Sequence, residues 1–146
     1  MPERSFQHAA TTSSPIPLVW SALDEPQTWE AVPGVDRVFD PVLNGSGQLM
    51  GFAFETVVGG KTHLGRAVPA GRQEERLMAW DITTTEIKGR VTVGLSPSGD
   101  GTRVYVELRV EGVGVLGNLF FPVIASAIGS GFPGTVEDFA ERLGSG

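Results

Sequence analysis

The sequence has 146 residues, which suits one domain over residues 1–146, and its 11 basic and 17 acidic residues give a net charge of −6. It contains no cysteine, which excludes disulfides, thiolate nucleophiles and cysteine metal sites. The basic residues are dispersed along the chain, so the basic patch that nucleic acid requires is missing.

The N-terminal part predicts one strand and two short helices. Residues 4–12 are rich in Phe, Ala and Thr, and the Ser13-Ser14-Pro15 sequence that follows is typical of a hydroxyl-capped helix start. Apolar residues at helical spacing fill residues 16–23, and Asp24-Glu25-Pro26 begins a second short helix that carries Trp29 and ends at residues 32–34. No signal-peptide pattern is seen, so we expect a cytoplasmic protein.

Six short strands should follow, because turn signals recur too often for a crossover helix. The predicted strands are residues 35–43, 48–58, 61–69, 74–83, 87–96 and 102–112. The turns include Gly59-Gly60, which suits a two-residue hairpin, and Pro69-Ala70-Gly71. Consecutive strands are therefore antiparallel neighbours, and the N-terminal strand makes the sheet seven-stranded.

The last two strands alternate most clearly between apolar and polar residues. One side carries Ile87, Val91, Val93, Leu95, Val104, Val106, Leu108 and Val110, and the other carries charged and polar residues. One face of the sheet should therefore be buried and the other exposed to water.

A long helix is predicted from Leu116 to Leu143, where apolar residues recur at steps of three and four. We expect a kink or short break between Gly129 and Pro133, with a deeply buried first half and a second half that lies on the surface. The apolar run 113–128 is interrupted and shorter than the about 20 residues that span a bilayer, so no membrane insertion is expected.

A sheet with one apolar face and a helix with an apolar stripe can bury both if the sheet curls around the helix. The sequence thus predicts an α+β fold: a seven-stranded antiparallel curved sheet around a long C-terminal helix, with two short helices after the first strand.

Several short motifs accompany this order of elements: Ser14-Pro15, Val19-Trp20-Ser21-Ala22-Leu23-Asp24, Trp29, Pro33-Gly34-Val35, Met78-Ala79-Trp80 and Gly101-Thr102-Arg103-Val104. The motifs and the order of elements resemble those of bacterial members of the helix-grip START/Bet v 1-like (SRPBCC) superfamily, in its polyketide cyclase/dehydrase-like branch. The resemblance implies a ligand cavity between sheet and helix. The helix itself suggests space, because its small residues Gly117, Ala125, Ala127, Gly129 and Gly131 withdraw volume.

A symmetric hairpin at Gly59-Gly60 places Phe52, Phe54, Thr56 and His63 on one side, which we take as the inner one because of the two phenylalanines. His63 is then the weak catalytic candidate, able to bond a ligand or act as a general base, although no acid is placed to orient it. An ordinary surface or satisfied histidine is the simpler interpretation.

The opposite parity would turn Glu55 and Arg66, a predicted cross-strand ion pair, into the cavity as polar anchors. Arg90 and Glu107 form a similar predicted pair on the exposed face, and both pairs are simplest to interpret as structural.

Aromatic and aliphatic residues supply the rest of the expected wall, although the same residue types would fill a plain core. The predicted ligand-binding set is Trp29, Met50, Phe52, Phe54, Thr56, His63, Trp80, Val91, Val106, Leu119 and Val123. Neither a metal nor a cofactor is expected, since His8 and His63 lack ligand spacing and no phosphate-binding glycine loop precedes a helix.

Three functions remain open. The first is binding of a small hydrophobic molecule, lipid or aromatic and polyketide-like, by a monomer or weak dimer. The second is a cyclase or dehydratase that uses the same cavity with His63 as the proton-transfer group. The third is a protein-interaction module with a docking patch near Phe120-Phe121-Pro122.

Overall fold

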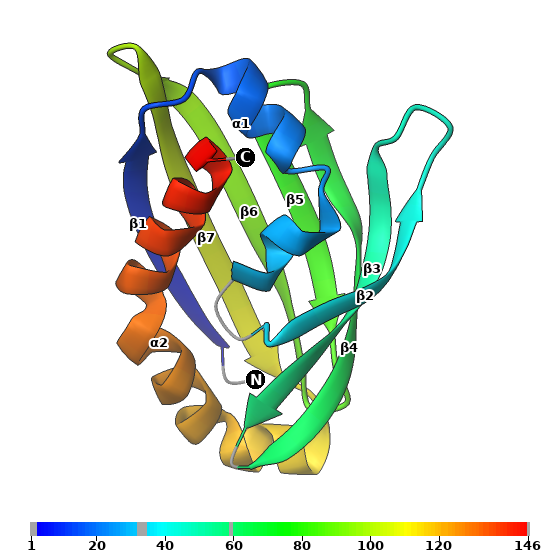
Figure 1. Cartoon of the computed structure of the whole chain (residues 1–146). Coiled ribbons are helices and arrows are strands. Elements are labelled where there is room, and N and C mark those ends of the chain that lie inside the picture. Colours follow the sequence, from blue (N-terminus) through cyan, green and yellow to red (C-terminus); the bar gives the residue numbers. More distant parts are fainter. Residues whose placement is uncertain (1–2, 32–34, 59, 146) are drawn as a thin grey trace.

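In the computed structural model, the described residues form one seven-stranded antiparallel sheet, two α-helices and one 3-10 helix (Figure 1). It describes residues 3–31, 35–58 and 60–145, without the side chains of residues 31, 58, 116, 120, 123, 124, 127, 128, 144 and 145. The strand order is β1-β7-β6-β5-β4-β3-β2, so each of the last six strands lies beside its neighbour in sequence. The predicted α+β architecture is confirmed.

The strands are β1 (Glu3–Thr12), β2 (Arg37–Leu43), β3 (Leu49–Val58), β4 (Lys61–Gln73), β5 (Leu77–Thr83), β6 (Ile87–Ser98) and β7 (Gly101–Gly112). The helices are α1 (Ile16–Ala22), η1 (Pro26–Ala31) and α2 (Gly114–Ser145). The predicted turn at residues 69–71 is wrong. A register shift between Pro69 and Gly71 lets β4 continue to Gln73, because a bulge accommodates the proline that a regular ladder would reject.

The predicted hydroxyl cap of α1 is also wrong. The N-cap residue is Pro15, whose side chain makes no capping hydrogen bond. The second short helix is η1, and the Trp29 Nε1–H donates to the Leu23 carbonyl oxygen at 2.9 Å. Its predicted end at residues 32–34 lies outside the described residues. The two helices cover one end of the inner face of the sheet (Figure 1).

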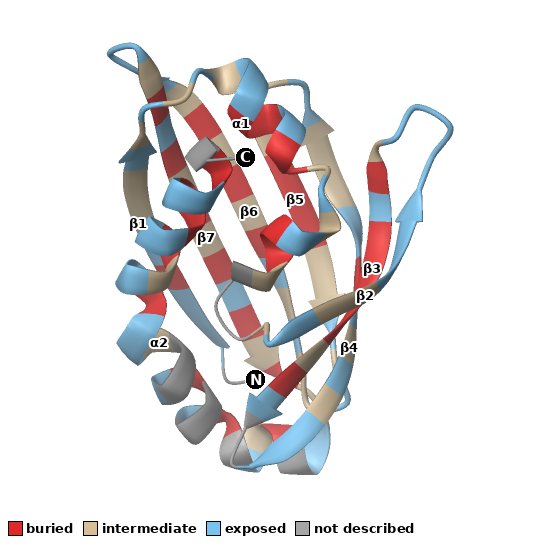
Figure 2. Ribbon diagram, in the orientation of Figure 1, coloured by how far each residue is buried: buried red, intermediate tan, exposed pale blue. Residues whose placement is uncertain are grey.

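The inner face of the sheet is the one that the sequence pattern predicts. Val91, Val93 and Leu95 on β6 are buried, as are the alternate residues of β7, whereas the charged residues between them are half-buried or exposed. The bands of buried residues across β5, β6 and β7 are visible in Figure 2. They face α2 and η1, so the core lies between the sheet and the helices.

α2 runs unbroken from Gly114 to Ser145, so a short break between Gly129 and Pro133 is excluded, and a kink there stays a prediction. Pro133 has no N–H group to donate to the carbonyl oxygen four residues earlier. Close to it, the Thr135 hydroxyl donates to the Gly131 carbonyl oxygen at 2.8 Å. The first turns of α2 cross one end of the sheet before the helix continues along β1 and β7 (Figure 1).

The second half of α2 has the predicted amphipathic form. Val136, Phe139 and Leu143 are buried, whereas Glu137 and Glu141 are exposed. This half therefore closes the core against β1, β7, α1 and η1.

β2 forms one edge of the sheet and is irregular. Its pairing with β3 shifts register on both sides of Val42, Pro41 supplies no N–H group, and Asp40 has a φ of 49°. The strand therefore bends between its two halves.

Candidate functional site

A cluster of aromatic rings lies on the inner face of the sheet beside η1. The Trp29 ring centroid lies 6.2 Å from that of Phe52, 5.8 Å from that of Trp80 and 5.7 Å from that of Phe139. Phe52 and Trp80 are also in contact, with ring centroids 5.3 Å apart. These rings join η1, β3, β5 and α2, so this end of the interior is filled with side chains.

Trp80 differs from the other two tryptophans in its hydrogen bonding. Its side chain is buried, and the Nε1–H group has no hydrogen-bond partner among the described residues. In contrast, Nε1 of Trp29 donates to the Leu23 carbonyl oxygen, and Nε1 of Trp20 donates to Glu74 Oε1 at 3.0 Å. A buried N–H without an acceptor costs about 1–3 kcal/mol, so Trp80 presents an unused donor inside an apolar wall.

Most predicted wall residues face the interior. Phe52, Phe54 and Thr56 on β3 are buried, as are Val91 on β6 and Val106 on β7. The prediction that these residues lie on the inner side of β3 is therefore confirmed. In the symmetric hairpin, Phe52 pairs with Ala67, Phe54 with Gly65 and Thr56 with His63, so all of them share that side.

Two predicted wall residues do not face the interior. Met50 is 42 % exposed and Leu49 is buried in its place. The alternation along β3 changes here because the β2–β3 register shifts where Val42 pairs with Gly51. Leu119 is 67 % exposed, since it lies on the outer side of α2. The Val123 side chain lies outside the described residues.

His63 lies near the end of the sheet where α2 begins. Its side chain is 9 % exposed, and its Nε2 atom is 3.4 Å from Oε2 of Glu86, a residue of the β5–β6 turn. The sequence expectation that no acid would orient His63 is therefore wrong. Sequence spacing could not have found Glu86, because the contact joins β4 to a turn of the next hairpin.

The glycines of α2 have a different role from the predicted one. A Cβ atom at Gly117 would lie 2.1 Å from the Glu86 carbonyl oxygen, and one at Gly129 would lie 2.7 Å from the Phe6 ring. These two glycines let α2 approach the β5–β6 turn and β1 closely. The prediction that they enlarge a cavity is therefore wrong.

Both predicted surface ion pairs have other partners. Glu55 contacts Arg37 across β2 and β3 at 3.3 Å instead of Arg66, and Arg90 contacts Asp81 on β5 at 2.8 Å instead of Glu107. The pairing register explains both contacts. Arg37 pairs directly with Glu55 and Asp81 with Arg90, whereas Arg66 pairs with Ala53 and Glu107 pairs with Thr92.

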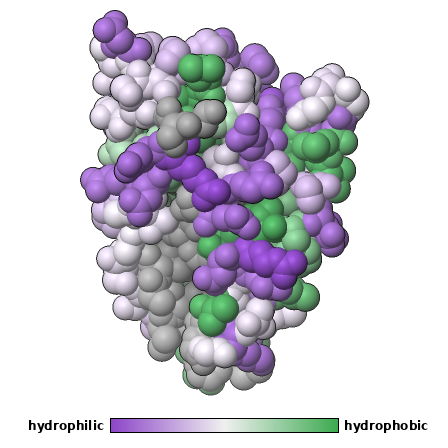
Figure 3. Space-filling view, viewed as in Figure 1, coloured by the Kyte–Doolittle hydropathy of each residue, from purple (hydrophilic) through white to green (hydrophobic). Residues whose placement is uncertain are grey.

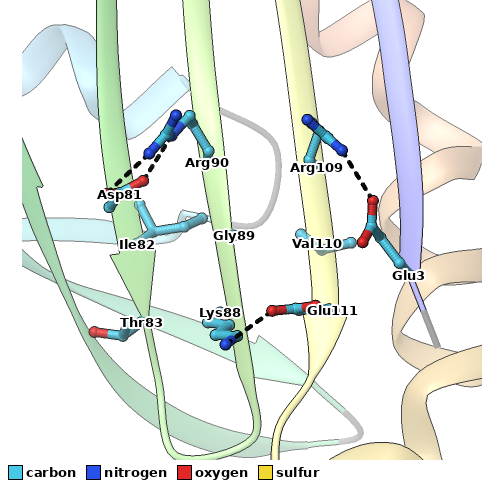
Figure 4. Close-up of a pocket in the computed structure, with 10 residues that line it drawn as sticks. All are labelled: Glu3, Asp81, Ile82, Thr83, Lys88, Gly89, Arg90, Arg109, Val110 and Glu111. Atoms are coloured by element: carbon cyan, nitrogen blue, oxygen red, sulfur yellow. Dashed lines mark hydrogen bonds and ion pairs between the residues drawn. The ribbon is translucent and has the colours of Figure 1, made fainter. Parts of the chain in front are cut away.

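A shallow hollow of about 420 Å³ lies on the outer face of the sheet over β5, β6, β7 and β1. Figure 4 shows its charged side chains joined in three pairs, Arg90 to Asp81, Arg109 to Glu3 and Lys88 to Glu111. Because every charge here is neutralised by a neighbour, we interpret this hollow as a structural ion-pair surface.

A network of polar contacts holds α1 and η1 against the sheet. Arg72 on β4 donates to both carboxylate oxygens of Asp24 at 2.9 Å, and its guanidinium lies 5.0 Å from the Trp20 ring centroid. The hydrogen bonds that Arg72 donates to Asp24 raise the pKa of Arg72, and desolvation opposes this rise. Asp24 Oδ1 also accepts the Leu49 N–H, so one carboxylate joins three elements.

The docking patch expected at residues 120–122 is not formed as predicted. Phe121 is buried, Pro122 is exposed, and the side chain of Phe120 lies outside the described residues. Exposed apolar residues instead include Val42 and Leu43, and apolar surface is visible beside the β2–β3 turn in Figure 3.

Within the described residues, no helix is long and apolar enough to cross a membrane. The same part of the chain contains no group of three or more histidine and acidic side chains placed to hold a metal ion.

The fold is shared with several solved structures. The Zhui aromatase/cyclase from Streptomyces sp. R1128 superposes with a TM-score of 0.70 at 14 % identity, over 97 % of this chain and 95 % of that one. A START superfamily protein from Mycobacterium smegmatis gives a TM-score of 0.63 at 13 % identity, over 92 % and 97 % of the two chains. This is the helix-grip fold.

A third helix-grip structure is larger than the present chain. The di-domain ARO/CYC StfQ from the steffimycin biosynthetic pathway gives a TM-score of 0.62 at 16 % identity, over 99 % of this chain and 52 % of that one. No family model matches the sequence, and no curated protein matches it significantly. At these identities the likeness establishes the helix-grip fold, and the ligand has to be argued from the residues.

Proposed function

We propose that this helix-grip protein binds a small hydrophobic molecule between the inner face of its sheet and α2. The observation that carries the proposal is the buried Nε1–H of Trp80, which has no acceptor among the described residues. A ligand oxygen that accepted this hydrogen bond would recover the cost of burying the donor.

The surroundings of Trp80 support an apolar ligand. Trp29 and Phe52 lie against it, and the inner residues of β6 and β7 are aliphatic. Because Trp29 and the other rings of the cluster occupy the space between Trp80 and η1, the ligand should extend from Trp80 in the other direction, past Phe54 and toward His63. Burial of apolar ligand surface at about 25 cal/mol per Å², less the cost of association, would supply the affinity.

Native mass spectrometry of freshly expressed protein is the first test, since a retained molecule would reveal both occupancy and mass. A thermal-shift panel of fatty acids, flavonoids and aromatic polyketides is the second, because a ligand that binds only the native state raises its melting temperature. If no molecule is retained and no member of the panel raises the melting temperature, the proposal is wrong.

Substitution of single tryptophans localises the binding. Trp80→Phe keeps an aromatic ring but removes the donor, so a ligand found in the panel should lose about fivefold in affinity, the value of one hydrogen bond. Trp20→Phe is the matched control, because the Trp20 N–H already bonds Glu74 and its loss should leave ligand affinity unchanged. Equal affinities of the two variants for the ligand would remove Trp80 from the site.

A cyclase or dehydratase is the second candidate. Zhui and StfQ are both described as aromatase/cyclases, and the contact between His63 and Glu86 provides a histidine beside a carboxylate near the proposed site. If the protein converts a poly-β-keto precursor, His63→Ala should abolish turnover while ligand binding persists. Unchanged turnover in that variant would exclude His63 from the chemistry.

A further inference from the structure

The contact between His63 and Glu86 has a consequence for which ligands the site accepts. We infer that Glu86 orients His63 so that Nδ1 accepts a hydrogen bond from the ligand, and that the site prefers neutral molecules with a phenol or enol hydroxyl over carboxylic acids. This inference rests on the proposed function, since it specifies the polar group of the same ligand.

The position of His63 places its ring at the inner face. It pairs with Thr56 on β3, in the row that continues through Phe54 and Phe52, and its side chain is only 9 % exposed. At Gly65, the next inward position of β4, the Phe54 ring occupies the space of a side chain, and its nearest atom would lie 2.3 Å from an added Cβ. His63 and Thr56 are therefore the first polar side chains beyond the aromatic wall on these two strands.

Glu86 fixes which nitrogen of His63 carries the proton. Its Oε2 atom lies 3.4 Å from Nε2, and a carboxylate at this distance favours a proton on the nitrogen that faces it. In the neutral imidazole, the other nitrogen is then an acceptor. Among the described residues, Nδ1 has no hydrogen-bond partner, so its lone pair is available to a ligand hydroxyl.

Glu86 is itself held in place by the backbone around it. Its carbonyl oxygen accepts the Val113 N–H at 2.8 Å, and Gly117 of α2 packs directly against the same peptide group. In the turn, the Glu86 N–H donates to the Thr84 hydroxyl at 3.2 Å. The carboxylate therefore starts from a fixed backbone position, which makes Glu86 a positioning residue for His63.

The distribution of positive charge argues against a carboxylate ligand. The chain has 11 lysine and arginine residues, all of them are described, and all except Arg72 are exposed. Arg72 is half-buried, but both of its terminal nitrogens bond Asp24. No cation is therefore free to neutralise an anionic ligand group inside, where an unpaired charge is costly, and Glu86 would repel it.

Two polar groups would thus recognise different parts of one ligand, the Trp80 N–H as a donor and His63 Nδ1 as an acceptor. Pro69 pairs with Trp80, and His63 lies six residues further along β4, which corresponds to about 20 Å at about 3.3 Å per residue. The two groups cannot bond the same oxygen. A neutral molecule with a hydroxyl at one end and an acceptor at a distance suits this arrangement.

Three probes of similar shape test the inference: naphthol, naphthyl methyl ether and naphthoate, with affinities measured by tryptophan fluorescence and calorimetry. Naphthol should bind about fivefold tighter than the ether, which has no hydroxyl proton, and more than tenfold tighter than naphthoate. Tighter binding of naphthoate than of naphthol would overturn the inference. If none of the three probes binds although a member of the thermal-shift panel does, this inference is wrong while the proposed function stands.

Variants connect this preference to His63. In His63→Leu, naphthol and the ether should bind equally, with the affinity for the ether retained. His8→Leu is the matched control, because His8 also contacts a glutamate, Glu137 at 3.5 Å, but this pair is largely exposed. An unchanged preference for naphthol in His63→Leu would remove His63 as the acceptor.

Nuclear magnetic resonance provides a readout that does not depend on a folded His63 variant. Long-range ¹H–¹⁵N spectra of the wild-type protein should show His63 as the Nε2–H tautomer, and naphthol should shift its Nδ1 resonance. Because the chain has only two histidines, His8→Gln assigns the signals. Glu86→Ala should reduce the share of this tautomer, and an Nδ1–H tautomer in the wild type would contradict the inference.

Discussion

The docking of α2 onto the β5–β6 turn predicts opposite effects for two glycine-to-alanine substitutions in the same helix. At Gly117, the added Cβ would lie 2.1 Å from the Glu86 carbonyl oxygen, whereas at Gly134 no atom lies within 4 Å. Both residues are helical, so alanine gains about 1 kcal/mol from its better helix propensity at either position, and only the local packing differs.

The cost at Gly117 follows from this distance. A carbon and a carbonyl oxygen normally stay at least about 3.3 Å apart, so the start of α2 would have to move by more than about 1 Å. Such overpacking costs about 3 kcal/mol when the neighbour is backbone, and the movement also strains the hydrogen bond from the Val113 N–H to the Glu86 carbonyl oxygen. Gly117→Ala should therefore destabilise the protein by about 2 kcal/mol, while Gly134→Ala stabilises it by about 1 kcal/mol.

Thermal and urea denaturation of the two variants measure this difference. With about 2–4 °C per kcal/mol for a chain of this size, the melting temperatures should differ by about 6–12 °C, with the wild type between them. If Gly117→Ala is as stable as Gly134→Ala, the helix does not rest on the β5–β6 turn and does not hold Glu86 in place.

Two further predictions concern ionisable groups. Asp24→Asn removes a charge from the largely buried pair with Arg72 and should destabilise the protein by about 2 kcal/mol in urea denaturation. Asp81→Asn removes a charge from an exposed pair and should change stability by less than about 1 kcal/mol. Equal effects of the two substitutions would contradict the difference in burial between the two pairs. Burial, and to a smaller extent the negative charge of Glu107, raise the pKa of Tyr105. Between the ordinary tyrosine pKa and this raised pKa, the unfolded chain loses the proton before the folded protein does, so the free energy of unfolding should fall as the pH rises. Absorbance titration of this only tyrosine is the measurement, and ionisation at or below the ordinary pKa would refute the reasoning.

The sequence was sufficient for the order of the six consecutive strands β2 to β7, the inner face of the sheet and the amphipathic second half of α2, but not for the position of β1 beside β7. These features follow from periodicity, which depends only on neighbouring residues. The inward row through Phe52 and Phe54 was correct because the two-residue hairpin fixes the register. The prediction is wrong at Met50, because a bulge in the neighbouring strand β2 changes which residues of β3 point inward there.

The candidate site was less accessible to sequence reasoning. Glu86 lies between two predicted strands, and nothing in the sequence pattern indicates that it provides the carboxylate beside His63. The sequence pattern suggests that Gly117 and Gly129 leave space for a ligand cavity. In the structure, the missing Cβ atoms make room for the Glu86 carbonyl group and for the Phe6 ring. In each case the deciding contact joins segments far apart in the chain, which periodicity does not report.

The irregular edge strand affects how this protein behaves at high concentration. An open sheet has two edge strands. A regular edge strand with free N–H and C=O groups would pair with a strand of another molecule and promote aggregation. Pro41 and the two register shifts of β2 interrupt the regular spacing that such recruitment needs. Self-association through the β2 edge of the sheet is therefore disfavoured, and a dimer of this protein would have to form through another surface.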